Sequence, residues 1–377
     1  MSLTDLPRGV LVHDWVEPIG GSENVLEALA SLLPGSDLVC SWMNAPERFP
    51  GRRIVETALA RPPWRGRKAI ALAASVAAWR RVPNRDYAWA LVSSHAFAHH
   101  CRFVGQRADF RKLVYVHSPA RYVWDPQLDV RGNHPLARIA ATPLQVVDRR
   151  RATEPTAIAA NSSYVADRVR RHWRRAASVI HPPVDVTGIR AVPDWADELS
   201  ERERDVLDRI GDEFVLGASR LIPYKRLDRV VAVGDRLALP VVVAGDGPER
   251  TALASAARGT RVPVHLLGEV STPMLRALYQ RARCYVFPPV EDFGIMPIEA
   301  MATGTPVVAS DTGGTAETVL PGSSGALVSD WDDLDAVAAA VRDAADLPRA
   351  GVATRADEFS GERFAERIGQ WVRDHVG

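Results

Sequence analysis

Two glutamates, Glu291 and Glu299, bracket a glycine-containing turn in the second half of the chain. The preceding run, Cys284–Phe287, is β-branched and aromatic, which predicts a buried strand. Pro297 suits the first turn of a helix, so the turn joins this strand to a short helix whose first turn carries Glu299. Free N–H groups at a helix start favour anionic oxygens, and carboxylates accept hydrogen bonds from hydroxyls. Either glutamate alone is better explained as a solvated acid that suits the helix dipole. The stretch as a whole favours binding of a diphosphate flanked by sugar hydroxyls.

A pair of basic residues follows another predicted strand, Phe214–Leu216. Arg220 and Lys225 lie in its strand-to-helix loop, and Lys225 is the only lysine in the second half of the chain. A lysine supplies a compact point charge that arginine does not. Because this half is acidic, we favour diphosphate binding over ordinary surface charge for the two residues.

Two histidines follow strands predicted at Tyr87–Val92 and Leu113–Val116. They are His95 and His117. The carboxyl ends of parallel strands face the ligand crevice of an open α/β sheet. A ligand-facing role and a role as backbone-bonded structural histidines are about equally supported.

Glycines lie at the ends of three further predicted strands. They are Gly20 and Gly21 after Gly9–His13, Gly245 and Gly247 after Val241–Ala244, and Gly268 after Val264–Leu267. Glycine lets the backbone approach a ligand closely, although an ordinary turn explains Gly20 and Gly21 as well. The G-x-G-x-x-G spacing of dinucleotide-binding folds is absent, which disfavours a nicotinamide cofactor.

The elements that position these residues alternate between strand and helix along the whole chain, which predicts parallel sheets. At 377 residues two domains are expected. Residues 1–190 contain 27 Lys and Arg against 16 Asp and Glu, whereas residues 191–377 contain 20 against 30. We therefore predict a domain at 1–187, a second at 188–357, and a final helix at 358–377 that crosses back to the first.

The composition and the motifs of the chain disfavour several classes of protein. Three cysteines without paired spacing suggest neither disulfides nor zinc and suit the cytoplasm. We find no signal-peptide core, and the apolar run Ala69–Trp79 is too short to span a bilayer. Asp292-Phe293-Gly294 lacks the companion motifs of a kinase metal loop, and the aspartates at 330–333 suit a helix cap, so no metal is expected.

One segment of the basic half could contact a membrane. Residues 61–85 are predicted as an alanine-rich helix with arginines and tryptophans near both ends. Such a segment suits an interface carrying anionic lipid, and a packed helix with solvated arginine ends is an equal alternative.

With these residues in hand, the chain resembles the retaining glycosyltransferases of family 4, which have the GT-B fold of two facing Rossmann-like domains with a cleft between them. The matching motifs are Gly20-Gly21-Ser22-Glu23, Asn161-Ser162, Pro182-Pro183-Val184-Asp185, Arg220 with Lys225, Gly245-Asp246-Gly247-Pro248, and Glu291-x-Phe293-Gly294 with Glu299. The stretch His117 to Asp125 is similar to bacterial mannosyltransferases that build O-antigen or exopolysaccharide from GDP-mannose. The position after the phosphate lysine is often glycine in the family and is Arg226 here.

The resemblance implies a role for each of these residues. The donor diphosphate would be held by Arg220 and Lys225, and by Gly20 and Gly21 from the acceptor-binding first domain. The ribose would contact Glu299 and the sugar Glu291, beside the turn Phe293-Gly294-Ile295 and the glycines at 245, 247 and 268. His95 would lie near the transferred sugar.

The reaction implied is retaining transfer of a hexose by front-face attack, which needs no cofactor, metal or nucleic acid. The donor expected is GDP-mannose and the acceptor a saccharide or lipid-linked saccharide, at the inner face of the plasma membrane. The alternatives are a UDP- or other NDP-sugar donor, a GT-B epimerase or phosphorylase, and a non-catalytic nucleotide-sugar-binding assembly protein.

Overall fold

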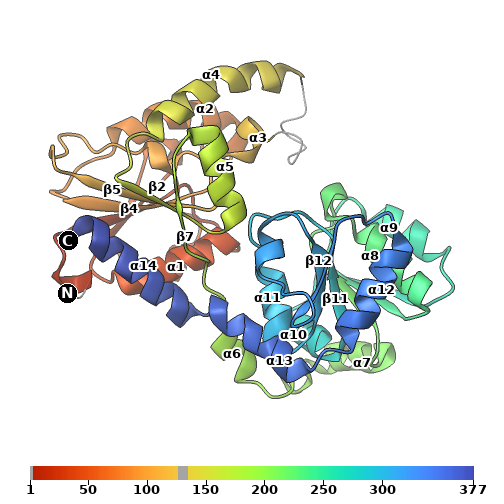
Figure 1. The fold of residues 1–377 in the computed structure, drawn as a ribbon. Coiled ribbons are helices and arrows are strands. Elements are labelled where there is room, and N and C mark those ends of the chain that lie inside the picture. Colours follow the sequence, from red (N-terminus) through yellow and green to blue (C-terminus); the bar gives the residue numbers. More distant parts are fainter. Residues whose placement is uncertain (1–2, 126–134) are drawn as a thin grey trace. The chain divides into compact units, whose positions relative to one another are not determined.

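The computed structural model describes residues 3–125 and 135–377, which divide into two compact units. The first consists of Met1–Pro183 with Gly361–Gly377, and the second of Val184–Ser360. Each unit is built on one parallel sheet, so the predicted fold class is confirmed at this level (Figure 1).

The first unit contains a seven-stranded sheet in the order β3-β2-β1-β4-β5-β6-β7. Its strands are β1 (Gly9–His13), β2 (Asp37–Cys40), β3 (Ile54–Glu56), β4 (Trp89–Ser94), β5 (Arg111–Val116), β6 (Ala157–Ala160) and β7 (Ser178–Val179). Every pair of neighbours in this sheet is parallel.

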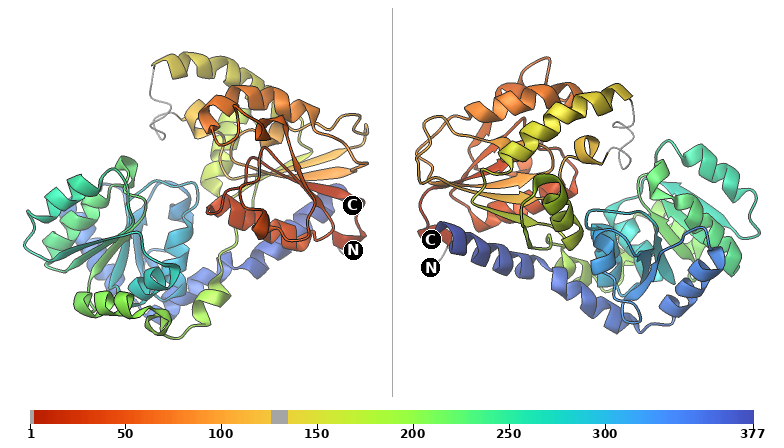
Figure 2. Two further views of the ribbon diagram at one scale, coloured as in Figure 1. Left: turned by 180° about the vertical axis from the view of Figure 1, so that it is seen from behind. Right: turned by 45° about the horizontal axis from the view of Figure 1, so that its top comes forward.

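Helices cover both faces of this sheet. They are α1 (Gly21–Leu32), α2 (Lys68–Ala78), α3 (Arg121–Trp124), α4 (Pro135–Arg151), α5 (Ser163–Trp173) and α14 (Gly361–Val376). In Figure 2, α1 and α14 lie on the same face of the sheet. One core cluster joins the sheet to these two helices, and the other joins it to α5. The chain thus returns to its first unit, where the Phe364 ring lies 5.9 Å from the Tyr115 ring.

The second unit contains a six-stranded sheet in the order β10-β9-β8-β11-β12-β13. Its strands are β8 (Val215–Ala218), β9 (Val241–Ala244), β10 (Val264–Gly268), β11 (Cys284–Phe287), β12 (Val307–Ser310) and β13 (Gly325–Val328). All of these pairs are parallel, and most of the strands are fully buried, as expected of a sheet covered on both faces.

The helices of this unit also form two layers. They are α6 (Val186–Arg190), α7 (Glu201–Ile210), α8 (Leu227–Leu237), α9 (Arg250–Ala257), α10 (Thr272–Arg281), α11 (Ile295–Ala302), α12 (Leu334–Ala345) and α13 (Arg349–Ala356). The core on one face draws on α6, α7, α10, α11 and α13, and the core on the other draws on α8, α9 and α12.

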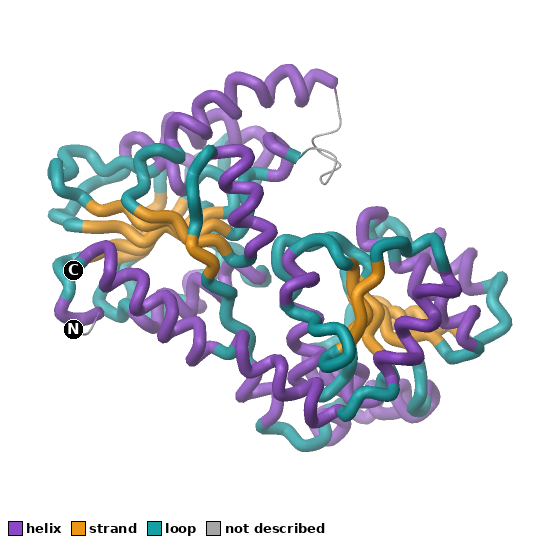
Figure 3. The backbone as a smooth tube through the Cα atoms, viewed as in Figure 1, coloured by secondary structure: helices purple, strands orange, loops and turns teal. Residues whose placement is uncertain are grey.

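Both sheets reverse their strand order at one point. The reversal lies between β1 and β4 in the first unit and between β8 and β11 in the second. Because neighbouring strands are parallel, the loops after them leave each sheet at one edge (Figure 3). Ligands of open α/β sheets bind outside such reversal points.

Some predicted elements were wrong in extent. The helix predicted at 61–85 is confined to Lys68–Ala78, since Gly66, with φ +74°, precedes it and Pro83 follows it. β4 ends at Ser94, which places Ser93 and Ser94 inside the strand. Among the described helices, none combines the length and the hydrophobicity that crossing a bilayer requires.

Candidate active site

The clearest functional contact in the second unit joins Lys225 to Glu291. Lys225 ends the short turn after β8, and Glu291 lies in the loop after β11. Their side chains form an ion pair across the reversal point of the sheet, and the Tyr224 hydroxyl donates to the Glu291 carboxylate at 3.3 Å. Two of the predicted site residues are thereby brought together.

The surroundings of Lys225 explain how a lysine only 8% exposed is tolerated. A buried ammonium needs a partner, which Glu291 provides. The ammonium also lies 5.0 Å from the centre of the Tyr224 ring and 5.7 Å from that of Phe287, within the range of cation–π attraction. The lysine is therefore fixed in place rather than solvated.

The glycine turns hold the Lys225 loop at the sheet edge. A Cβ on Gly245 would lie 1.9 Å from the Ser219 carbonyl oxygen, so this position has no room for a side chain. Leu221 donates its N–H to the Asp246 carbonyl at 2.9 Å, and Gly245 donates to the Gly268 carbonyl at 2.7 Å. The loops after β8, β9 and β10 therefore pack as one layer. Gly247 lies in it too, with the Leu221 carbonyl oxygen 2.4 Å from where its Cβ would be.

The Glu291 loop is held from the other side by the loop after β12. Gly314 donates its N–H to the Glu291 carbonyl at 2.7 Å, and the Thr315 hydroxyl donates to the Phe293 carbonyl at 3.2 Å. Gly294 adopts φ +96°, a left-handed conformation that favours glycine, and leads into α11 at Ile295. In the described chain no side chain caps this helix start, which leaves its N–H groups open to an anion.

Glu299 is half-buried on α11, one turn beyond the helix start rather than in the first turn as predicted. Burial raises the pKa of its carboxyl to about 7, although nearby Arg276 acts to lower it. The group can therefore change its charge near neutral pH.

Arg220 is exposed in the same loop as Lys225. Arg226, the position where the family often has glycine, adopts φ +49° and pairs with Asp332 at 2.8 Å. The backbone therefore keeps the left-handed conformation that glycine would favour, and the arginine side chain is directed to an aspartate.

In the first unit, Asp14 organises the loop that carries His95. Asp14 directly follows β1 and is 1% exposed. Its two carboxylate oxygens accept the backbone N–H groups of residues 95, 96, 97 and 98 at 2.7–2.8 Å. The His95 ring nitrogen Nδ1 lies 3.7 Å from the same carboxylate. This aspartate therefore holds the backbone of the loop, and the His95 ring lies beside its carboxylate.

Three histidines meet at the reversal point of the first sheet. The Ser93 hydroxyl bridges His13 Nδ1 at 3.0 Å and His117 Nε2 at 2.7 Å. The His95 ring lies 5.2 Å from the His13 ring and 6.4 Å from the His117 ring. The predicted pair of histidines is thus brought together, with His13 as a third member.

These histidines differ in their access to solvent. Burial, reinforced by the nearby His95, lowers the pKa of His13 to about 3. Burial also holds the pKa of His117 well below its usual range. His95, by contrast, has a side chain that is 20% exposed. The two neutral rings support it, and His95 is the member of the group that can reach a ligand.

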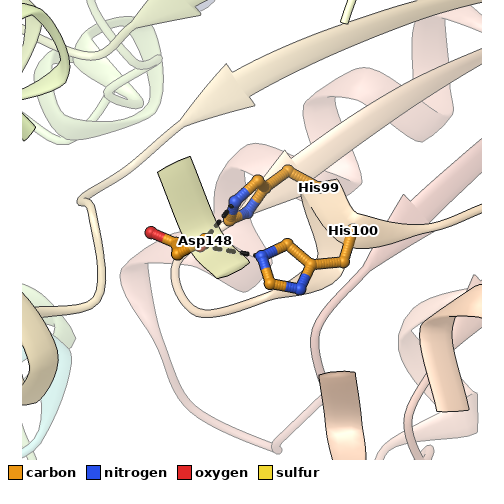
Figure 4. Close-up of side chains that lie close together, drawn as sticks. All are labelled: His99, His100 and Asp148. Carbon is orange, nitrogen blue, oxygen red and sulfur yellow. Dashed lines mark hydrogen bonds and ion pairs between the residues drawn. The ribbon is translucent and has the colours of Figure 1, made fainter. Parts of the chain in front are cut away.

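A second histidine cluster lies under the same loop. His99 Nε2 and His100 Nε2 contact one oxygen of buried Asp148 at 2.9 and 2.7 Å (Figure 4). The indole N–H groups of Trp124 and Trp173 donate to its other oxygen at 2.7 Å each. Although the three residues of Figure 4 lie close enough to hold a metal ion, the carboxylate already accepts hydrogen bonds from His100, Trp124 and Trp173. The cluster therefore acts as a structural clamp.

The paired glycines of the first unit begin α1. Gly20 precedes the helix and Gly21 is its first residue. No side chain of the described residues caps this helix start. Glu23 is 3% exposed and folds back, so that it accepts the Glu17 N–H at 3.2 Å.

Sequence reasoning missed Asp14, His13, Ser93 and Tyr224. A signal was present for the first two, because they follow the apolar run of β1 in the same way that His95 follows β4. The contacts of Ser93 and Tyr224 depend on residues distant in the chain, which no local pattern reveals.

Comparison with known proteins finds a family that matches most of the second unit. The family Glycosyl transferases group 1 matches residues 200–358. The GDP-mannose-dependent alpha-(1-6)-phosphatidylinositol monomannoside mannosyltransferase of Mycolicibacterium smegmatis is 32% identical over 226 residues, which cover 56% of this chain and 57% of that protein. The D-inositol 3-phosphate glycosyltransferase of Mycobacterium avium is 34% identical over 200 residues, 50% of this chain and 45% of that protein. The chain spans about half the length of these curated relatives.

Solved structures match the whole chain in fold. Anabaena HepE in complex with UDP-glucose has a TM-score of 0.69 at 16% identity and covers 97% of this chain and 99% of that one. Sucrose-phosphate synthase from Thermosynechococcus elongatus has a TM-score of 0.68 at 19% identity, with 97% and 98% covered. The predicted GT-B fold is thereby confirmed, and residues 200–358 of this fold match the family Glycosyl transferases group 1.

Proposed function

We propose that the chain is a retaining glycosyltransferase that moves mannose from GDP-mannose to a lipid-linked saccharide at the inner face of the plasma membrane. The observation that carries the proposal is the Lys225–Glu291 pair at the reversal point of a group 1 domain. The mannosyl donor is favoured by the first relatives found, whose names specify GDP-mannose.

In the proposed reaction, Lys225 exchanges Glu291 for the donor diphosphate, and exposed Arg220 joins it. Their positive charge stabilises the negative charge that develops on the departing nucleotide, and Glu291 becomes free to accept hydrogen bonds from sugar hydroxyls. Glu299, in its ionised form, accepts from the ribose hydroxyls. The acceptor hydroxyl attacks from the face that the nucleotide leaves, and its proton passes to a phosphate oxygen.

The first unit supplies His95 near the transferred sugar. Its position is supported by Asp14 and by the hydrogen bonds of His13 and His117 to Ser93. The uncapped start of α1, at Gly21, offers N–H groups to a phosphate. The reaction as proposed requires no metal and no cofactor.

The test is release of nucleotide from a panel of GDP-, UDP-, ADP- and dTDP-sugars, with membrane lipid extract as acceptor and with EDTA present. We expect GDP release from GDP-mannose and a labelled lipid product that EDTA does not suppress. Preferred turnover of UDP-glucose would instead assign UDP-glucose as the donor, which is the sugar nucleotide bound in the HepE structure. Binding of GDP-mannose without any release would support the non-catalytic alternative, and turnover that requires a free sugar phosphate or a second nucleotide sugar would support a phosphorylase or an epimerase.

A further inference from the structure

The first unit carries a groove of about 620 Å³ that none of the proposed site residues lines. It lies along α2, beside the outer strands β2 and β3 and the segment that follows β3. Its volume falls in the range of roughly 300–1,000 Å³ that is usual for small-molecule sites. A ligand of substantial size therefore fits it.

The lining of the groove is mainly hydrophobic. Ala74, Ala77 and Ala78 of α2 have helical spacing on one face, and their short side chains leave the space beside the helix open. Val55 and Leu59 line the same space from β3 and the turn after it. Such a lining suits a flexible hydrocarbon chain.

Positive charge also lines this groove. Arg61 and Arg81 are exposed lining residues, and neither guanidinium is paired with a carboxylate of the described residues. The one lining carboxylate, Glu56, already accepts the Met43 N–H at 2.7 Å and pairs with Arg65 at 3.0 Å. The groove thus combines an apolar wall with two uncompensated cations, a combination that matches an amphiphile with an anionic head.

We propose that this groove binds the hydrocarbon chain of a phosphate-headed lipid, with the phosphate on Arg61 and Arg81. The inference rests on the proposed function, in which such a lipid carries the saccharide acceptor. It deepens that function by giving the lipid a site of its own within the first unit.

The first experiment is calorimetric titration of the full chain with hexyl, octyl and decyl phosphate below their micelle concentrations. We expect affinity to rise by about fourfold for each added methylene, because each one leaves water for the groove. Octyl glucoside, which has the same chain and no charge, should bind at least about tenfold more weakly than octyl phosphate, a difference of ~1.4 kcal/mol. Equal affinities along the series, or full competition by inorganic phosphate, would mean a plain anion site and overturn the proposal.

Two variants locate the ligand. Ala77→Trp fills the groove from an exposed helix position, and Arg81→Gln removes one cation. Each should weaken octyl phosphate binding by about tenfold or more, whereas Arg85→Gln, an exposed arginine outside the lining, should leave it unchanged. Unchanged binding in Arg81→Gln would overturn the proposal even if Ala77→Trp failed to fold.

Nucleotide release from GDP-mannose, measured on the same variants, separates this inference from the proposed function. We expect release without acceptor to persist when lipid binding is lost. If the wild-type chain binds alkyl phosphates in the groove but turns over no sugar nucleotide, the proposed transferase fails and the lipid site stands. If it turns over GDP-mannose but adsorbs to anionic vesicles without any dependence on chain length, the lipid site fails alone.

Discussion

Lys225 and Glu291 form an ion pair between the loops after β8 and β11, the two strands that flank the reversal of strand order in the second sheet. The pair neutralises a lysine that is 8% exposed and leaves its ammonium at the sheet edge. A bound diphosphate would replace the carboxylate as the partner of the ammonium. The ion pair therefore keeps the lysine at the sheet edge without leaving a buried charge unpaired.

Replacing this lysine should abolish most activity. We expect Lys225→Ala to reduce kcat/KM for glycosyl transfer by the equivalent of about 2–4 kcal/mol, because it removes a cation that stabilises the leaving nucleotide. Steady-state kinetics with GDP-mannose measure this. Lys68→Ala is the matched control, since Lys68 pairs with Glu17 in the first unit at 3.2 Å. A rise in KM alone, with kcat unchanged, would assign Lys225 to binding rather than to the chemical step.

Much of this site was predictable because parallel sheets place their loops at one edge. Strands such as β6, β9 and β11 were predicted from apolar runs, and the end of each strand identifies the residues of the loop that follows it. From this we could predict that Lys225, Glu291 and the glycine turns lie close together. The same reasoning grouped His95 with His117.

The other features of the site could not be predicted, because they depend on contacts between residues that are far apart in the sequence. Asp14 accepts hydrogen bonds from N–H groups more than eighty residues away, and Asp148 accepts three from side chains of α3, α5 and the turn after β4. The edge strand β3 was not predicted, because its three residues are too few to show a period. The predicted cleft between the two units stays a prediction.

Donor binding should depend on pH through Glu299. Its pKa of about 7 means that the carboxyl is largely protonated at pH 6 and largely ionised at pH 8. Because the ionised form is the better acceptor of ribose hydroxyls, affinity for GDP should rise as pH increases through 7, by up to about tenfold. Calorimetry at several pH values measures the change. Glu299→Gln should bind more weakly and lose the pH dependence, and a dependence that survives in this variant would exclude Glu299 as its source.

Asp14→Asn should disrupt the loop that carries His95. An amide offers one acceptor oxygen, so N–H groups of residues 95–98 would lose partners in a buried setting, at a cost of about 1–3 kcal/mol for each unsatisfied group. We expect a lower Tm together with a loss of transfer. Asp109→Asn, at an exposed aspartate paired with Arg107, provides the control and should change neither. Transfer at the wild-type rate in folded Asp14→Asn would remove Asp14 from the support of the site.

Substitutions of Arg226 measure how much its left-handed backbone conformation lowers the free energy of unfolding. Arg226→Gly relieves the φ of +49° but loses the exposed pair with Asp332, which contributes only about 0–1 kcal/mol. Arg226→Ala loses the same pair and keeps the strained conformation. Chemical denaturation should therefore find the glycine variant more stable than the alanine variant by about 1 kcal/mol. Equal stability of the two variants would show that the conformation carries no penalty here.

Acid should destabilise the first unit well above the pH at which carboxylates titrate. Burial lowers the pKa of His13 to about 3 and of His100 to about 4, and holds that of His117 well below its usual range. Unfolding restores a pKa near 6.5 to each ring. Below pH 6.5 the unfolded chain therefore binds protons at rings that stay neutral in the folded chain, and the free energy of unfolding decreases as the pH drops. Between pH 7.5 and 5.5 the three rings together should cost about 4 kcal/mol. Urea unfolding across this range measures the loss, and replacing His100 with Gln should reduce its slope by about a third. A free energy of unfolding that stays constant between these pH values would mean that the buried rings accept protons in the folded state.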